Sequence, residues 1–67
     1  MYAIRNKRTK KWLYGTDFRE YPYKQRISNE QAMLFESKED AEYQFRRRDC
    51  KEDEYEIVKV KLIIDEI

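Results

Sequence analysis

The stretch 55–64, YEIVKVKLII, gives the clearest structural signal in the chain, and the rest of the fold can be read outward from it. One parity is wholly apolar from position 58 onward: Val58, Val60, Leu62 and Ile64. The other parity carries Lys59 and Lys61, with Tyr55, Ile57 and Ile63 at its two ends. An alternation of apolar and charged residues is typical of a β-strand with one buried face. We therefore expect a long final strand that turns its valine side to the core.

The segment before this strand has the signals of a helix. Ser37 is a good N-cap, and the acidic residues that follow it suit the positive end of a helix dipole. Ala41 and Phe45 are four positions apart and so share a helix face. We expect a helix from Lys38 to about Asp49.

The N-terminal third indicates a hairpin. Residues 2–6 and 12–14 both alternate, and the polar stretch between them is short enough for a loop. Gly15 is expected to end the second strand with a positive φ or a bulge. Residues 16–30 are interpreted as an aromatic loop around Pro22, with a strand near 23–27 as an option.

The apolar run 32–36 is expected to form a brief third strand. The order of elements then predicts an α+β fold in one small domain, residues 1–67, with an antiparallel sheet of three or four strands and one helix packed on one face. The predicted core consists of these residues: Ile4, Leu13, Leu34, Phe35, Ala41, Phe45, Val58, Val60, Leu62 and Ile64.

The absence of histidine removes the commonest general base and metal ligand from the chain. Cys50 is the only thiol, so neither an intrachain disulfide nor a thiolate zinc site can form. Arg48 and Lys51 beside it can lower its pKa, or Cys50 can be a half-buried residue at the helix end. We expect a protein that is not an enzyme and has no metal or other cofactor.

Charge is divided unevenly along the chain. Residues 1–31 carry eight Lys or Arg and three Asp or Glu, whereas residues 32–67 carry seven and eleven. The net charge is only +1, which argues against both a strongly basic DNA binder and an acidic DNA mimic. A surface of two signs suits a protein partner or self-association, unless the fold interleaves the two halves.

The segment from 12 to 26 combines aromatic and basic side chains and is the candidate partner-binding site. Its members are Trp12, Tyr14, Phe18, Arg19, Tyr21, Tyr23, Lys24 and Arg26. Trp, Tyr and Arg dominate hot spots of protein interfaces, and aromatics beside cations also stack bases and contact phosphates. A third interpretation is structural, with Trp12 and Phe18 completing a small core while the tyrosines keep their hydroxyls outward.

The run Arg46–Arg48 offers a second cationic feature. Guanidinium groups bind phosphate and carboxylate in bidentate fashion, but consecutive helix positions point in different directions. All three arginines therefore cannot face one ligand. The alternative is that they cap the negative end of the helix and pair with nearby acids.

Three stretches carry a resemblance to known proteins: YAIRNKRTKKWLYGTDF, QRISNEQAMLFESKEDAEYQF and YEIVKVKL. The unit LFESKEDAE, a strand followed by a serine cap and a helix, resembles small proteins of bacteriophages and prophages of Gram-positive bacteria. The resemblance covers most of the chain and brings no catalytic motif. It implies a protein that acts by binding a host or defence protein.

These observations lead to one functional expectation with two alternatives. We expect a non-enzymatic binding module that occupies the surface of a protein partner in the cytoplasm, the host cytoplasm if the protein is phage-encoded. The alternatives are a single-stranded nucleic-acid binder and a small structural homo-oligomer. No membrane partner is expected, because no apolar run approaches the roughly 18 residues that span a bilayer, and the N-terminus has no apolar signal core.

Overall fold

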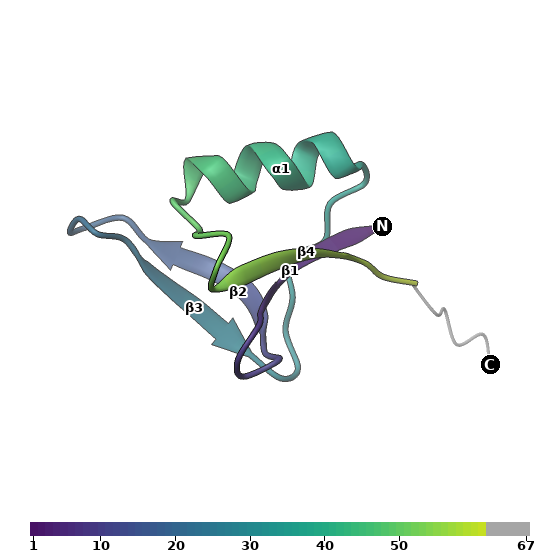
Figure 1. Ribbon diagram of the computed structural model, residues 1–67, viewed down its shortest axis with the longest axis horizontal. Coiled ribbons are helices and arrows are strands. Elements are labelled where there is room, and N and C mark those ends of the chain that lie inside the picture. Colours follow the sequence, from purple (N-terminus) through teal and green to yellow (C-terminus); the bar gives the residue numbers. More distant parts are fainter. Residues whose placement is uncertain (62–67) are drawn as a thin grey trace.

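The computed structural model describes residues 1–61 and contains a four-stranded antiparallel sheet with one helix, which confirms the α+β class. The strands follow the order β3-β2-β1-β4 across the sheet, and the helix packs on β1 and β4 (Figure 1). The elements are β1 (Tyr2–Asn6), β2 (Trp12–Asp17), β3 (Lys24–Ser28), α1 (Lys38–Arg47) and β4 (Tyr55–Lys59).

The helix begins where its cap predicts. Ser37 has extended backbone dihedrals, and its hydroxyl accepts a hydrogen bond of 3.1 Å from the N–H of Asp40. The helix ends with Arg48 as its C-cap, slightly earlier than the expected Asp49. Asp49 has a φ of 55°, in the left-handed region that terminates a helix.

The prediction for Gly15 is half right. The second strand does not end there but continues to Asp17, and Gly15 has no positive φ. The register between β2 and β3 shifts between Leu13 and Gly15, so the bulge alternative is confirmed. The optional strand near 23–27 forms as β3 and turns the expected loop into a hairpin (Figure 1).

The predicted strand at 32–36 is wrong. Only Phe35 pairs there, in an isolated antiparallel bridge with Tyr2, while the N–H of Met33 donates to the carbonyl of Leu13. This short segment bonds to β1 through one residue and to β2 through another, which is too little for a strand of its own. Leu34 lies between these two residues and is 43% exposed, so its place in the predicted core is also wrong.

The core lies between α1 and the sheet. Five predicted residues are confirmed: Ile4, Leu13 and Ala41 are buried, and Phe35 and Phe45 pack at the margin of the core. Cys50 and Tyr55 belong to this core and were missed, and Ala3 is buried on the opposite face of the sheet. Core burial is therefore concentrated where β1, β2 and β4 meet the underside of the helix.

The predicted burial side of the last strand is wrong. Ile57 pairs with Ile4 beneath the helix, whereas Val58 pairs with Ala3 on the opposite face, where Arg5 and Glu56 also lie. The alternation of residues along a strand distinguishes its two faces but does not predict which of them a helix covers. Val58 and Val60 are half-buried, and Leu62 and Ile64 lie outside the described residues.

Candidate binding site

The tip of the β2–β3 hairpin is shaped by Asp17 and Pro22. The Asp17 carboxylate accepts hydrogen bonds from the backbone N–H and the guanidinium of Arg19, and the ion pair measures 2.8 Å. This pairing lowers the pKa of Asp17 well below its usual range and raises that of Arg19. The peptide bond between Tyr21 and Pro22 is cis. The Arg19 guanidinium is therefore already paired within the turn, although its side chain remains largely exposed.

Three aromatic rings gather at this tip, and we call Phe18, Tyr21 and Tyr23 the aromatic tip. The rings of Phe18 and Tyr23 lie 4.9 Å apart between centroids, and those of Tyr21 and Tyr23 lie 5.4 Å apart. Both pairs are edge-to-face, the geometry that ring quadrupoles favour. Even so, Tyr21 is 76% exposed and Phe18 is 44% exposed. The rings support one another without being buried.

Two arginines from the end of α1 complete this surface. The guanidinium carbons of Arg47 and Arg48 lie 5.6 Å and 5.7 Å from the centroid of the Phe18 ring, within the range of a cation–π contact. Burial and the nearby Arg47 charge lower the pKa of Arg48. Neither guanidinium forms an ion pair with a carboxylate among residues 1–61. The surface therefore presents aromatic rings framed by two cations.

Gln25 fixes the hairpin to the helix. Its side-chain amide donates to the backbone carbonyl of Arg48, and its Oε1 accepts a hydrogen bond from the hydroxyl of Thr16. The bond from Gln25 satisfies the carbonyl of Arg48, which lies at the end of α1 and has no intrahelical partner. This bridge places Phe18 beside Arg47 and Arg48.

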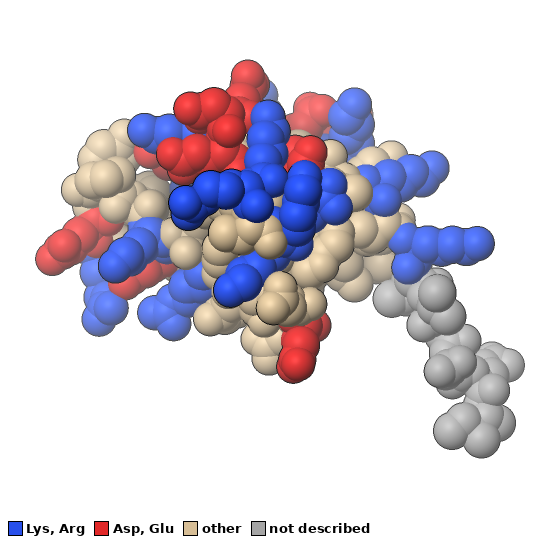
Figure 2. All heavy atoms as spheres, turned by 60° about the horizontal axis from the view of Figure 1, so that its bottom comes forward, with Lys and Arg blue, Asp and Glu red and all other residues tan. Residues whose placement is uncertain are grey.

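The remaining predicted residues lie elsewhere. Alternation along β2 and β3 places Trp12, Lys24 and Arg26 on the sheet face away from the helix, and Tyr14 sits at the bulge, 39% exposed. Figure 2 shows Lys and Arg side chains spread across the side of the molecule opposite the helix. The eight predicted residues thus divide between the tip and a basic sheet face.

The Trp12 ring takes part in contacts within the sheet. Arg5 stacks over its ring at 5.6 Å and donates two hydrogen bonds to one carboxylate oxygen of Glu56. The guanidinium lowers the pKa of Glu56. Trp12 therefore belongs to a cross-strand stack of β1, β2 and β4 on the face opposite the helix, and neither to the aromatic tip nor to the core in which the structural interpretation placed it.

The contact between the arginine run and the aromatic segment was not predicted from the sequence. Arg46 points away and lines a different cleft, while Arg47 and Arg48 face Phe18. The run itself was visible, and so was the divergence of its side chains. What no pattern supplied was the long-range hydrogen bond from Gln25 that brings the two segments together.

Cys50 does not have the features of a reactive thiol. It is buried in the core cluster with Ile4, Leu13 and Tyr55, and burial raises its pKa to about 11. The alternative in which Arg48 lowers the pKa is wrong in its net direction, because desolvation outweighs the attraction of that charge, and the structural alternative holds. The half-buried alternative understated how deeply the side chain is placed.

Within residues 1–61, no three His, Cys, Asp or Glu side chains are grouped so that they can hold a metal ion. The same residues contain no helix of the length and apolarity needed to cross a membrane. No protein-family model, curated protein or solved structure matches the chain at a significant level.

Proposed function

We propose that this chain is a binding module that docks on a protein partner through the aromatic tip and its two flanking arginines, Arg47 and Arg48. One observation carries the proposal: Tyr21 is 76% exposed although it belongs to an ordered cluster of rings. An exposed aromatic that is already held in place loses little conformational freedom on binding. Tyr and Arg are also the side chains that contribute most at interface centres.

The tip defines the chemistry of the partner. Phe18 and Tyr21 need an apolar depression, and Arg47 and Arg48 need carboxylates at its rim. Arg19 contributes less, because Asp17 already pairs with it. We therefore expect a partner surface with a shallow apolar pocket and an acidic border.

The mechanism that follows is occupancy of the partner's surface rather than chemistry. The chain offers no histidine and no exposed thiol among its described residues, and of the two carboxylates at the hairpin tip Asp17 is paired with Arg19 and Glu20 is exposed. The resemblance to small phage proteins supports a host or defence factor as the partner, met in the host cytoplasm. Blocking that factor is the effect we expect.

The test compares Tyr21→Ala with Tyr43→Ala. Tyr43 lies on α1, is 57% exposed and provides a matched aromatic outside the aromatic tip. After capture and identification of a partner from host lysate, its affinity is measured for both variants by calorimetry. Tyr21→Ala should weaken binding by about 2 kcal/mol or more, roughly thirtyfold, and Tyr43→Ala should not. Equal affinities for both variants would contradict the proposed site.

The basic sheet face supports a second candidate, binding of single-stranded nucleic acid. Lys24 and Arg26 are exposed on that face beside Tyr14. Fluorescence anisotropy with oligonucleotides over a salt series tests this candidate. A steep salt slope that becomes shallower in the double variant Lys24→Gln, Arg26→Gln would favour nucleic acid, because each phosphate contact releases a counterion. Weak binding that is indifferent to both changes would favour the protein partner.

A further inference from the structure

Strand β4 forms one edge of the sheet, and alternate residues direct their backbone groups outward. The N–H of Lys7 donates to the carbonyl of Glu54, and the N–H of Val60 donates to the carbonyl of Met1. In an antiparallel ladder, residues of this parity bond to the neighbouring strand and the intervening ones face away. Ile57 and Lys59 therefore present N–H and C=O groups to the outside, where no strand of residues 1–61 pairs with them.

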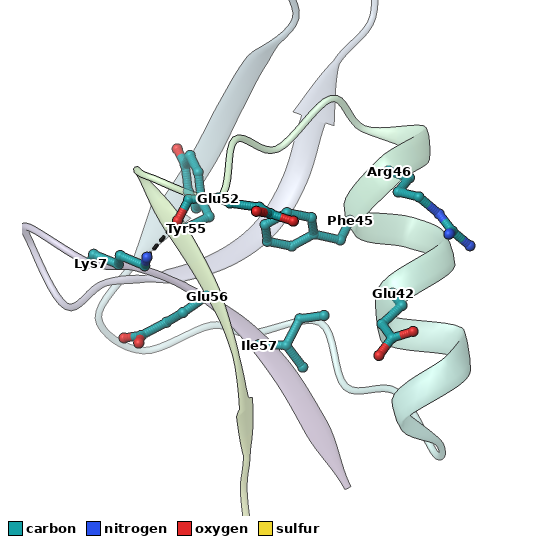
Figure 3. A pocket seen from close by; sticks show the side chains of 8 residues that line it. All are labelled: Lys7, Glu42, Phe45, Arg46, Glu52, Tyr55, Glu56 and Ile57. Carbon is teal, nitrogen blue, oxygen red and sulfur yellow. Dashed lines mark hydrogen bonds between the residues drawn. The ribbon is translucent and has the colours of Figure 1, made fainter.

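An open cleft of about 410 Å³ lies beside this edge, between β4 and α1 (Figure 3). Phe45 projects into it from the helix, and Tyr55 and Ile57 approach it from the strand. Charged residues complete the lining: Lys7, Glu42, Arg46, Glu52 and Glu56, of which Glu56 turns its carboxylate to Arg5 on the other face of the sheet. The cleft thus combines an apolar centre with a charged border, as ligand sites of this size commonly do.

The backbone edge and the cleft belong to the same residues. Ile57 offers its peptide groups outward while its side chain lies on the helix side of the sheet and lines the cleft. Cross-strand partners share a face, so a strand added to β4 would direct the side chain opposite Ile57 into the cleft beside Phe45. Its next side chains on that face would lie opposite Tyr55 and Lys59.

We propose that this edge binds an extended peptide segment of a partner protein, which pairs antiparallel with β4. The segment places an apolar side chain opposite Ile57. N-terminal to that side chain by two positions it carries an acid opposite Lys59, which is exposed. Two positions C-terminal to the apolar side chain, the segment carries a basic residue opposite Tyr55. That position is close to the three acidic residues that precede β4, Glu52–Glu54. Addition of a strand supplies the affinity, and the alternating side chains supply the specificity.

Lys59 argues against a second copy of the chain as the occupant. A symmetric antiparallel pair centred on Ile57, Val58 or Lys59 places Lys59 opposite Tyr55, Ile57 or the other Lys59, respectively. None of these registers gives the lysine a carboxylate, and an edge lysine is a common protection against such pairing. A peptide with an acid at this position removes the obstacle.

The experiment uses a yeast-displayed library of nine-residue peptides with the central pattern acid–x–apolar–x–base, and a second library with the two charges exchanged. Enrichment on the intact protein should occur from the first library. In the complex, the amide protons of Ile57 and Lys59 should exchange more slowly with solvent. Failure to enrich binders from the first library, or equal enrichment from both, would overturn the proposal.

Two variants at one position separate the backbone from the charge. Lys59→Pro removes an outward N–H, which an edge strand tolerates, and should weaken peptide binding about tenfold or more. Lys59→Gln keeps the N–H and should weaken binding only about two- to fivefold. Equal losses for the two variants would contradict strand addition, provided that circular dichroism shows both to be folded.

The proposal is independent of the aromatic tip, and the same experiments keep the two apart. Tyr21→Ala should leave peptide binding unchanged, because the tip is formed by the β2–β3 hairpin. Sedimentation of the free protein provides the last control. Self-association that Lys59→Pro abolishes would assign the edge to a second copy and overturn the peptide proposal.

Discussion

Two regions of this molecule meet the same helix in different ways. Beneath α1, the sheet is held by apolar burial, with Ile4 of β1 paired to Ile57 of β4 and with Leu13, at the start of β2, in the same core. At the end of α1, the part of the β2–β3 hairpin beyond the bulge is held by polar contacts, through Gln25 and the arginines over Phe18. Apolar burial excludes a partner, whereas the polar attachment leaves aromatic rings exposed. The contrast explains how so small a domain can keep a core and still present large rings to solvent.

The largest effect should come from the region of apolar burial. Leu13 is fully buried, and Leu13→Ala should lower the free energy of unfolding by about 2–5 kcal/mol. A loss of that size is a large part of the roughly 5–15 kcal/mol that stabilises a typical domain. Tyr21→Ala at the aromatic tip should change it by less than about 0.5 kcal/mol. Urea unfolding followed by circular dichroism measures both, and similar losses would mean that the tip is part of the core.

A smaller effect is expected at the polar attachment. Gln25→Ala leaves the Arg48 carbonyl without its side-chain donor and should cost about 1–3 kcal/mol. Gln31→Ala is the matched control, because Gln31 is exposed and its side chain makes no hydrogen bond with residues 1–61. Chemical unfolding gives the stability, and chemical shifts of the Phe18 ring report whether the arginines remain over it. Unchanged ring shifts in Gln25→Ala would show that the hairpin does not need this bridge.

The two regions also differ in how far the sequence predicts them. The serine cap, the helix and the sheet class were predictable because each depends on local spacing, as Ser37 and the Ala41–Phe45 pair show. The burial side of β4 was not, since both of its faces carry apolar residues and only the pairing of Ile57 with Ile4 decides between them.

The candidate site was predictable in composition but not in arrangement. Its aromatic residues stood out, yet Phe18 and Trp12 lie in different clusters. Their separation follows from the bulge at Gly15 and from the contact between Gln25 and Arg48, two residues 23 positions apart. Long-range hydrogen bonds of this kind leave no periodic trace in a sequence.

The reactivity of the Cys50 thiol reports how well the core excludes solvent. A pKa of about 11 in place of about 9 leaves roughly a hundredfold less thiolate at pH 8, so labelling of the folded protein by a disulfide reagent should be slow and should accelerate in urea. Between these pKa values the unfolded chain binds fewer protons than the folded one, so stability should fall as pH rises from about 9 to about 11.

Cys50→Ala is the control for that titration. It removes the thiol, so the decline in stability over the same pH range should become shallower, although Tyr55, whose pKa burial also raises, contributes in the same direction. Thermal unfolding at several alkaline pH values measures both proteins. Rapid labelling of the folded wild type at pH 8 would show that solvent reaches Cys50.

The smallest effect should come from the ion pair at the tip. Arg19→Gln removes the partner that lowers the pKa of Asp17, so the carboxyl should titrate nearer to its ordinary value of 3.8. Because the folded pKa is depressed, the pair stabilises the protein above the unfolded pKa and loses this effect as pH falls through the folded value. Because solvent screens this pair, the change in the unfolding free energy at pH 7 should be the smallest of the changes predicted here. Carbon-detected NMR of the Asp17 carboxyl follows the titration, with Lys24→Gln as a control that removes a nearby charge outside the pair. A large stability loss in Arg19→Gln would show that the tip depends on this pair. The tip would then be held as firmly as the apolar core, which contradicts the comparison made above.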